Sequence, residues 1–369
     1  MIRLATVFSG IGAIEQALKQ LGIDYKVVFA CDNGERYLDI DQEEIEEKIK
    51  GLTPEEKQKY ISKIYNETGK VNNVKKSYFA NYDISEDRWY EDIRFLDGNK
   101  YKGKVDLIVG GSPCQSFSTY GKKRGLEDTR GTLFYDYARL IKEIQPKVFI
   151  FENVKGLLSH DKGRTWSVIK DVFESLNYKI KYQVINACDY GLPQLRKRVF
   201  VVGINKNIES EEFSFPDKIE LEHTAKDYLD DEVDDKYYLP FKGFRYVTTP
   251  ERNEGRARVN RDIIGCETAN QQFNWIGDFR VEKPKPQHYN DPRIYIGEYE
   301  GQEAVARKMT PQECLKLMGF QDFNVVVDDK TAYRQAGNSI AVPVLKEITK
   351  SILNTVNFDG DDSNGEIQK

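Results

Sequence analysis

The chain has 369 residues, 39% of them hydrophobic and 31% charged, and a formal net charge of −5. This length is enough for a large domain with its own core and a smaller second domain. No apolar run reaches the roughly 18 residues of a membrane-spanning helix, and the opening MIRLATVFSG is typical of a strand, so we expect no membrane partner and no signal peptide.

Cysteine and histidine usage restricts the chemistry further. The five cysteines are widely separated and include no CxxC pair, and the chain has three histidines. These numbers predict neither a disulfide framework nor a metal site. We expect reduced thiols in a protein of the cytoplasm.

The chain opens with a pattern typical of a strand–helix–strand unit. Strands are expected at 2–8 and 26–30, and a helix at 12–21, where apolar residues recur at helical spacing. Residues 39–76 break this alternation, because they are rich in Glu, Lys and Gln and have weak periodicity. We interpret them as a charged helical insertion, a solvated surface element.

Strands and helices alternate again further along the chain. Apolar runs at 105–109, 147–151 and 198–204 predict parallel strands, and helices are expected near 131–144 and 163–176. Such alternation is typical of an α/β fold with a doubly wound, Rossmann-like sheet.

The region after these strands has a different character. Short aromatic and polar segments without a repeat fill residues 206 to 306, and we expect a smaller domain over 206–327 that ends with the helix of MTPQECLKLMGF. The large domain then comprises 1–205 and 328–358. The remaining residues, 359–369, are predicted to form a disordered acidic tail.

One cysteine stands where a reactive group is expected. The apolar run 105–109 ends in two glycines, and Pro113-Cys114-Gln115 follows, with three basic residues at 122–124. Catalytic groups collect at the carboxyl ends of parallel strands, and nearby positive charge stabilises a nucleophilic thiolate. Most cysteines, however, are small core residues, so Cys114 alone does not establish a site.

Polar residues end two further apolar strands. Glu152 closes the run 147–151, 38 residues after Cys114, and could act as an acid or remain an ordinary strand-end carboxylate. Arg196 and Arg198 alternate at the start of a strand, so they should share one face. Their planar cations suit a carbonyl oxygen or a carboxylate, although an exposed basic strand end would look the same.

A glycine-rich loop joins the first strand to the first helix. Gly10 and Gly12 allow the backbone to approach a ligand closely, and Asp32 ends the second strand, where an acid can accept hydrogen bonds from ribose hydroxyls. The alternatives are a plain tight turn at the glycines, a helix cap at Asp32 and the cofactor loop of a dinucleotide-dependent oxidoreductase. No GxGxxG spacing follows, which weakens the oxidoreductase alternative.

Taken together, the ordered motifs resemble those of the DNA (cytosine-5) methyltransferase family, bacterial or phage type. The motifs are TVFSGIGAIEQAL, the Pro-Cys-Gln segment, FENV, QLRKR, RKMTPQECLKLMGF and AGNSIAVPVL, spread over residues 1–205 and 307–350. The resemblance makes 1–205 and 328–358 the catalytic domain and 206–327 the target-recognition domain. It implies methyl transfer from S-adenosylmethionine to carbon 5 of a cytosine.

Within this resemblance, four residues take catalytic roles. Cys114 matches the nucleophile that adds to ring position 6 of cytosine, and Glu152 matches the acid that faces ring nitrogen 3. Arg198 would hold the base oxygen, and Arg196 would orient the acid.

The resemblance also implies a set of donor contacts. The residues concerned are Phe8, Gly10, Gly12, Asp32, Asp92, Ile93 and Asn338. Asp83-Ile84 competes with Asp92-Ile93 for the adenine-contacting block, Asn33 stands where the family often has a bulkier residue, and Asn338 could instead cap a helix.

DNA contacts are expected in two regions. The segment after Cys114 resembles a mobile loop that closes while the target base leaves the stack, with Gln115, Ser118 and Arg130 as DNA contacts. In the smaller domain, residues 252–261 include four arginines and one glutamate, a local excess of positive charge. We expect Arg256 and Arg258 to contact DNA, a solvated charged face being the alternative. The family's usual Thr-Leu pair is not evident in this sequence, and Thr268 is the candidate for its equivalent.

Two other functions compete with DNA methylation. An RNA cytosine-5 methyltransferase would share the catalytic motifs, but RNA-acting relatives carry Cys-Phe-Thr where this chain has Cys266-Glu267-Thr268. A nonenzymatic DNA-binding relative should have lost Cys114 or Glu152. We therefore expect a monomeric cytoplasmic enzyme that acts on double-stranded DNA, with a cognate restriction endonuclease as a further partner.

Overall fold

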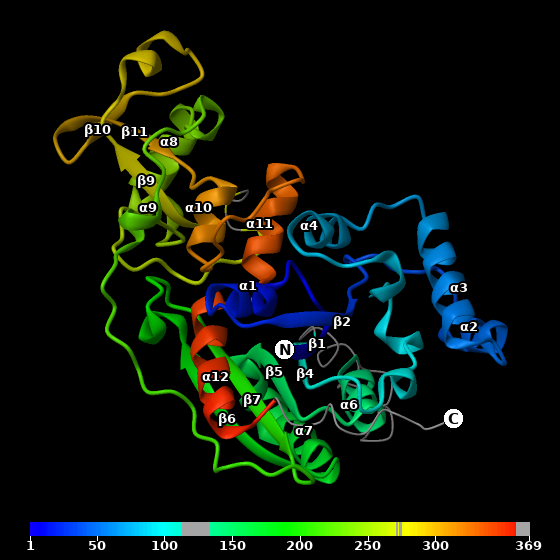
Figure 1. Ribbon diagram of the computed structural model, residues 1–369. Coiled ribbons are helices and arrows are strands. Elements are labelled where there is room, and N and C mark those ends of the chain that lie inside the picture. The colour runs from blue at the N-terminus through cyan, green and yellow to red at the C-terminus, as the bar shows by residue number, and fades with distance from the viewer. Residues whose placement is uncertain (113–132, 271, 273–274, 359–369) are drawn as a thin grey trace. The chain divides into compact units, whose positions relative to one another are not determined.

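The computed structural model describes residues 1–112, 133–270, 272 and 275–358 (Figure 1). The chain divides into two compact units: the first comprises 1–185, 197–217 and the chain from 345 on, and the second comprises 186–196 and 218–344.

These boundaries differ from the expected domain boundaries in three places. Residues 206–217, expected in the smaller domain, belong to the first unit. Residues 186–196 belong to the second unit, where Leu195 N donates to Ile264 O at 2.9 Å. Residues 328–344 also belong to it, and the Tyr333 hydroxyl donates to Met309 O at 2.6 Å. Both segments are held by bonds between residues far apart in the sequence, which no local pattern reveals.

The first unit contains a seven-stranded sheet in the order β3-β2-β1-β4-β5-β7-β6. Neighbours from β3 to β5 are parallel. The strands are β1 (Ile2–Val7), β2 (Tyr25–Cys31), β3 (Trp89–Tyr90), β4 (Leu107–Gly110), β5 (Val148–Val154), β6 (Tyr178–Asn186) and β7 (Lys197–Asn205). The expected α/β fold with a parallel-rich sheet is therefore confirmed.

The prediction of a parallel strand at 198–204 was wrong in its direction. The strand β7 runs antiparallel to β5, with Glu152 opposite Phe200 and Val154 opposite Arg198. The cause is β6, which the sequence analysis did not predict. Only residues 187–196 connect β6 to β7, too few for the dozen or more residues that a parallel crossover needs.

Helices cover both faces of this sheet. The helices α6 (Leu133–Ile144) and α7 (Arg164–Ser175) pack on one face through a core that includes Phe134, Phe151 and Phe173. Figure 1 shows α1 (Ala13–Gln20) and α12 (Val342–Thr355) on the other side. Because both faces are buried, the central strands are almost continuously apolar.

Three helices follow β2: α2 (Gln42–Ile49), α3 (Pro54–Glu67) and α4 (Asn73–Asn81). Thr53 begins α3 with a capping box, accepting from Glu56 N at 3.2 Å, and Pro54 occupies the first helical position. The helices α2 and α3 share a small core with Phe95. The insertion is therefore helical, and it packs against residues outside itself.

The second unit has a four-stranded sheet in the order β10-β11-β9-β8. The strands are β8 (Ala257–Val259), β9 (Gly277–Glu282), β10 (Gly297–Tyr299) and β11 (Gln302–Arg307), and the helices are α8 (Phe241–Thr248), α9 (Pro250–Asn253), α10 (Pro311–Lys316) and α11 (Asp329–Asn338). Its core includes Phe244 of α8, Phe279 of β9 and Ala306 of β11.

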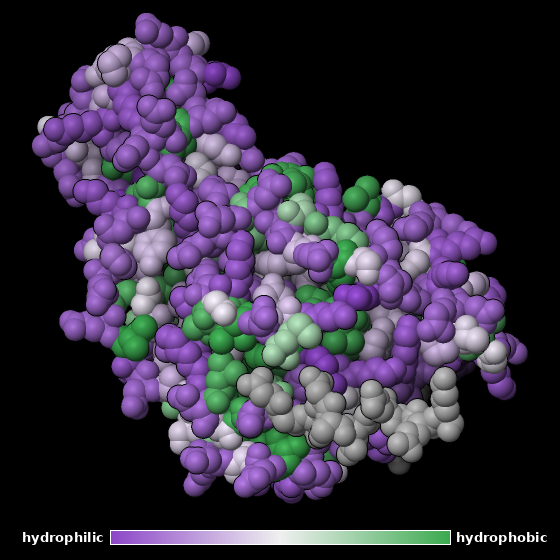
Figure 2. All heavy atoms as spheres, in the orientation of Figure 1, coloured by the Kyte–Doolittle hydropathy of each residue, from purple (hydrophilic) through white to green (hydrophobic). Residues whose placement is uncertain are grey.

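The visible face of the molecule is mostly hydrophilic, with hydrophobic side chains in patches (Figure 2). Among the residues that the structure describes, no helix is long and apolar enough to span a membrane.

Candidate active site

Glu152 and Arg198 form an ion pair on neighbouring strands. Arg198 Nε lies 3.1 Å from Glu152 Oε1, and the two side chains are 18% and 14% exposed. Glu152 is near the carboxyl end of β5, and Arg198 is near the start of β7. A partly buried carboxylate next to a permanent cation can hold a polar ring and exchange a proton with it.

The end of β4 lies directly against this pair. A Cβ at Gly111 would lie 2.5 Å from Glu152 O and 3.0 Å from Glu152 Oε2, and one at Gly110 would lie 2.6 Å from Val7 O. Asn153 Nδ2 donates to Ser112 O at 2.9 Å. The backbone that leads to Cys114 is therefore held beside Glu152 up to Ser112.

Several predicted residues lie outside the described part of the chain. Cys114, Gln115, Ser118 and Arg130 belong to the segment 113–132, and their predicted roles stay predictions.

The loop after β1 has an unusual backbone. Phe8, Gly10 and Gly12 have φ angles of 52°, 52° and 78°. A Cβ at Gly12 would lie 2.2 Å from the Tyr82 ring, whereas one at Gly10 would meet only Phe8 O, at 3.9 Å, among the described residues. The loop is therefore tightly packed at Gly12 and open at Gly10, where a ligand could approach the backbone.

Asp32 connects this loop to the turn after β2. Its carboxylate accepts from Gly10 N at 3.0 Å and from Gly34 N at 2.8 Å. Burial raises the pKa of the Asp32 carboxyl, and the two backbone N–H groups offset part of that rise. The N-cap of α2 is Asp41, so Asp32 braces two turns instead of capping that helix.

Asp92 and Ile93 lie in the first unit, after β3. The Asp92 carboxylate accepts from Arg94 Nη2 at 2.6 Å and from the Tyr65 hydroxyl at 2.7 Å. The Asp92 side chain is 4% exposed, and Ile93 is buried. The competing Asp83 is exposed. Tyr65 belongs to the insertion, and its place could not be predicted from the sequence because a polar, weakly periodic segment does not indicate which side chains point inward.

Arg196 lies in the second unit, just before β7. Its guanidinium donates to three backbone carbonyls: Glu267 O at 2.9 Å, Gly337 O at 3.0 Å and Ser339 O at 2.6 Å. These bonds make it a structural brace for the residues on both sides of Asn338, and its role in orienting Glu152 stays a prediction. Asn338 itself is the last residue of α11 and exposed, so it is not the cap of α12, which begins at Val342.

The predicted DNA-contacting arginines lie just before β8 and within it. Arg256 is 64% exposed and pairs with Glu254 at 2.9 Å. Arg258 is 40% exposed and lies 3.7 Å from Asp278 Oδ2. Arg256 is therefore largely accessible to solvent, whereas Arg258 is accessible only in part, because its Nε is buried.

Two hollows in the first unit are lined without Gly10, Asp32 or Asp92. One of about 710 Å³ is lined by Ile2, Glu211 and Thr355, at the amino end of β1 and so away from the glycine loop. Another, of about 460 Å³, is lined by Arg36, Asn72 and other residues around the insertion. Among the described residues, no group of three or more His, Cys, Asp and Glu could hold a metal ion.

A parallel-rich sheet with a glycine loop, a second-strand acid and a Glu–Arg pair at strand ends is typical of an α/β protein that binds its ligand at the carboxyl ends of the strands. The family model described as C-5 cytosine-specific DNA methylase matches residues 55–354. The chain belongs to this family of enzymes.

Curated relatives agree with this assignment. Type II methyltransferase M.SsoII of Shigella sonnei is 39% identical over 291 residues, which cover 77% of this chain and 72% of the relative. Type II methyltransferase M.HpaII of Haemophilus parainfluenzae is 37% identical over 299 residues, covering 76% and 80%.

Solved structures share the fold. A mutant of Spodoptera frugiperda DNMT2 superposes with a TM-score of 0.67 at 20% identity, covering 96% of this chain and all of the other. The Dnmt2 methyltransferase of S. pombe gives a TM-score of 0.63 at 16% identity, covering 96% and 98%. Identities this low support the fold alone.

Proposed function

We propose that this enzyme transfers a methyl group from S-adenosylmethionine to carbon 5 of a cytosine in a specific double-stranded DNA sequence, through a covalent adduct with Cys114. The observation that carries the proposal is the Glu152–Arg198 pair, which lies against Gly111, three residues before Cys114 in the sequence.

The proposed chemistry follows from the weakness of carbon 5 as a nucleophile. The Cys114 thiolate adds to carbon 6, and Glu152 supplies a proton to ring nitrogen 3, so that carbon 5 gains enamine character. Arg198 donates to the base oxygen and keeps Glu152 oriented. After methylation, loss of the carbon 5 proton to solvent expels the thiolate, and ring nitrogen 3 returns its proton to Glu152, which restores the neutral aromatic ring and the acid.

The first unit supplies groups that we expect to hold the methyl donor. When bound, S-adenosylmethionine supplies a methyl group whose carbon is electrophilic because it is attached to a positively charged sulfonium. The open backbone at Gly10 and the Asp32 carboxylate offer the close approach and the hydrogen-bond acceptor that a ribose-containing ligand requires. Phe8, Gly12, Asp92 and Ile93 complete the proposed set in this unit, although the family match begins at residue 55 and so does not include the loop. Asn338 belongs to the second unit, and its contact with the donor stays a prediction.

DNA binding belongs to the same proposal. A base inside a duplex is out of reach of a thiol, so the target cytosine must leave the stack, with Gln115, Ser118 and Arg130 contacting the DNA. Residues 206–327, including Arg256 and Arg258, would read the sequence. The Type II names of the relatives support a cognate restriction endonuclease as partner, and we propose a monomer that acts in the cytoplasm.

The direct test is to express the chain in a host without cytosine methylation and to map 5-methylcytosine in the genome. We expect methylation at one recurring sequence. The purified enzyme should then methylate a duplex with that sequence and not an RNA transcript of it. Equal or greater activity on the RNA would favour the RNA-methylating alternative.

The adduct can be tested separately with a duplex that carries 5-fluorocytosine at the target. Fluorine cannot leave carbon 5 as a cation in the way that hydrogen leaves as a proton, so the thiolate is not expelled. We expect a covalent complex with the wild type and with Cys188→Ser, the matched control, and none with Cys114→Ser. Glu152→Gln should slow adduct formation by about 10²–10⁴-fold, the usual contribution of a positioned acid. An adduct formed at the normal rate by Cys114→Ser would exclude this mechanism.

A further inference from the structure

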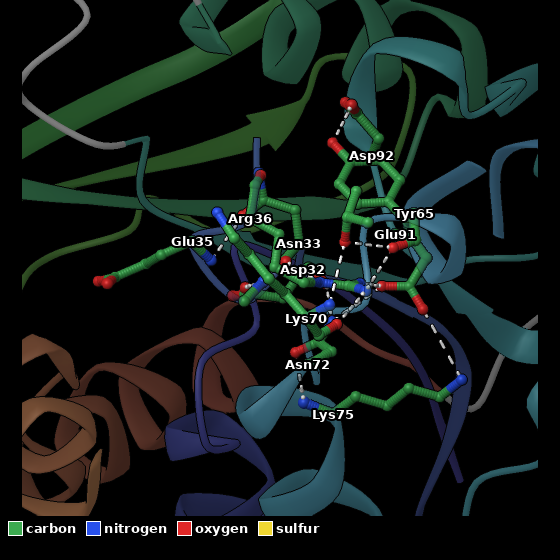
Figure 3. A network of polar contacts seen from close by, with 12 residues as sticks. Asp32, Asn33, Glu35, Arg36, Tyr65, Lys70, Asn72, Lys75, Glu91 and Asp92 are labelled. Carbon is green, nitrogen blue, oxygen red and sulfur yellow. Dashed lines mark hydrogen bonds and ion pairs between the residues drawn. The ribbon is translucent and has the colours of Figure 1, made fainter. Parts of the chain in front are cut away.

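Two side chains of the helical insertion (residues 39–76) lie in the interior of the first unit. Tyr65, on α3, is 0% exposed, and Asn72, the N-cap of α4, is 7% exposed. Figure 3 shows both in one polar network with residues that follow β2 and β3, namely Asp32, Asn33, Arg36, Glu91 and Asp92.

Asn72 holds the turn that carries Asp32. Its Nδ2 donates to Asp32 O at 2.9 Å and to Glu91 Oε2 at 2.8 Å, while its Oδ1 accepts from Lys75 N at 2.9 Å. A Cβ at Gly34 would lie 2.3 Å from Asn72 Oδ1. Asn72 is therefore packed directly against the turn in which Gly34 N donates to the Asp32 carboxylate.

Arg36 ties the same turn to the end of α3. Its Nε donates to Asn33 O at 2.9 Å, and its Nη1 donates to Tyr65 O and Lys70 O at 3.4 Å each. Its other nitrogen pairs with Glu91, and both side chains of this ion pair are 3% exposed. Buried charges are retained only when they are well partnered, so the turn has little freedom to shift while these bonds persist.

Tyr65 extends the network to the second acid. Its hydroxyl donates to Asp92 Oδ2 at 2.7 Å, and its ring lies under the Arg36 guanidinium at 4.9 Å. One face of the insertion therefore reaches both Asp32 and Asp92.

We propose that the insertion is a working part of the donor site, in which Asn72 is a positioning residue for Asp32 and Tyr65 is a positioning residue for Asp92. The inference rests on the proposed donor role of these two acids. Loss of the Asn72 amide removes one donor from Asp32 O and one from Glu91, so the turn relaxes and the carboxylate leaves the position that the ribose requires. Donor binding then weakens, whereas the chemistry at Glu152 is unchanged.

The test is calorimetric titration with S-adenosylhomocysteine, together with KM for S-adenosylmethionine and kcat at saturating donor. Asn72→Ser keeps a hydroxyl that can cap α4 but is too short to hold both partners. For Asn72→Ser and Tyr65→Phe we expect a Kd about five- to tenfold higher, the loss of one hydrogen bond to a charged or buried polar group. The donor KM should rise by a similar factor, with kcat within about twofold of the wild type.

Matched controls separate positioning from simple loss of stability. Thr53→Ala removes the N-cap of α3 in the same insertion, and Tyr60→Phe removes a hydroxyl from the same helix outside this network. Both should leave the donor Kd unchanged, even where Thr53→Ala lowers Tm as much as Asn72→Ser does. In an Asp32→Ala background, Asn72→Ser should have no further effect on Kd, because the group that it positions is gone.

The outcomes are distinguishable. If Asp32→Ala binds S-adenosylhomocysteine as the wild type does, the donor site is misassigned and this inference falls with it. If Asp32→Ala weakens binding but Asn72→Ser and Tyr65→Phe behave like Thr53→Ala, the proposed function stands and the insertion is only structural. Additive effects of Asp32→Ala and Asn72→Ser would also overturn the positioning role.

Discussion

At the scale of single residues, the proposed chemistry depends on how closely two strand ends approach each other. Gly111 lies so near Glu152 that a Cβ would be 2.5 Å from a backbone oxygen, which cannot move aside as a flexible side chain could. Glu152 also bonds to Arg198 through its side chain. Any displacement of β4 from β5 therefore changes the position of the acid and of the segment that leads to Cys114.

We predict that Gly111→Ala lowers methyl transfer by tenfold or more and stability by about 1–3 kcal/mol, the usual range for overpacking. Gly156→Ala is the matched control, because a Cβ there meets nothing within 4 Å among the described residues. Single-turnover rates and urea unfolding measure the two effects. Wild-type rates for Gly111→Ala would mean that the close approach is unimportant for catalysis.

At the scale of elements, β8 combines a structural strand with exposed positive charge. It pairs in parallel with β9, and Ala257 belongs to the core of the second unit. Arg256 and Arg258 flank that buried residue in the sequence; Arg256 is 64% exposed, whereas Arg258 is 40% exposed and lies partly against Asp278. An acidic chain can therefore present a local basic surface to a polyanion.

We predict that replacing Arg256 and Arg258 with alanine weakens DNA binding on target and scrambled duplexes alike. Each lost phosphate contact should reduce the slope of log affinity against log salt by about 0.9. A loss of target preference would instead indicate base contacts. The control is Arg293→Ala, which removes a 78% exposed arginine of the same unit. If affinity, slope and preference all stay at wild-type values, the recognition surface lies elsewhere.

At the scale of the whole molecule, stability is coupled to pH through buried acids. Glu267 is 2% exposed. Burial raises its pKa to about 8, although the Cys314 thiol and the Arg196 guanidinium lower it. Burial also raises the pKa of Glu15 to about 7, in spite of its hydrogen bond from Tyr78. Both side chains are therefore buried most favourably in the neutral form.

We predict that stability falls as pH rises from 6 to 8. A carboxyl whose pKa is higher in the folded state binds its proton more tightly there, so its contribution is complete at low pH and is lost as pH rises to the folded pKa. Glu267→Gln stays neutral and should reduce the fall by up to about 1.4 kcal/mol per pH unit. Urea unfolding at pH 6, 7 and 8 measures this effect, with the exposed Glu251→Gln as control. Parallel curves for Glu267→Gln and the wild type would contradict it.

Local patterns predicted much of the candidate site. The glycine loop after β1, Asp32 after β2 and Glu152 in β5 stand at strand ends that apolar runs alone indicated, and Asp32 does bond to Gly10. Arg196 shows where such reasoning stops. Its spacing from Arg198 suggested a shared task, but its bonds go to carbonyls 71 to 143 residues away in the sequence.

The sequence by itself determined the α/β class, the family and the order of the motifs, because periodicity and motif spacing are local properties. The tertiary structure decided the antiparallel direction of β7, the membership of residues 186–196 and 328–344 in the second unit, and the contacts of Tyr65 and Asn72 with Asp92 and Asp32. These features depend on which distant segments meet. The polar composition of residues 39–76 does not predict these contacts, because two buried polar side chains produce no hydrophobic periodicity in the sequence.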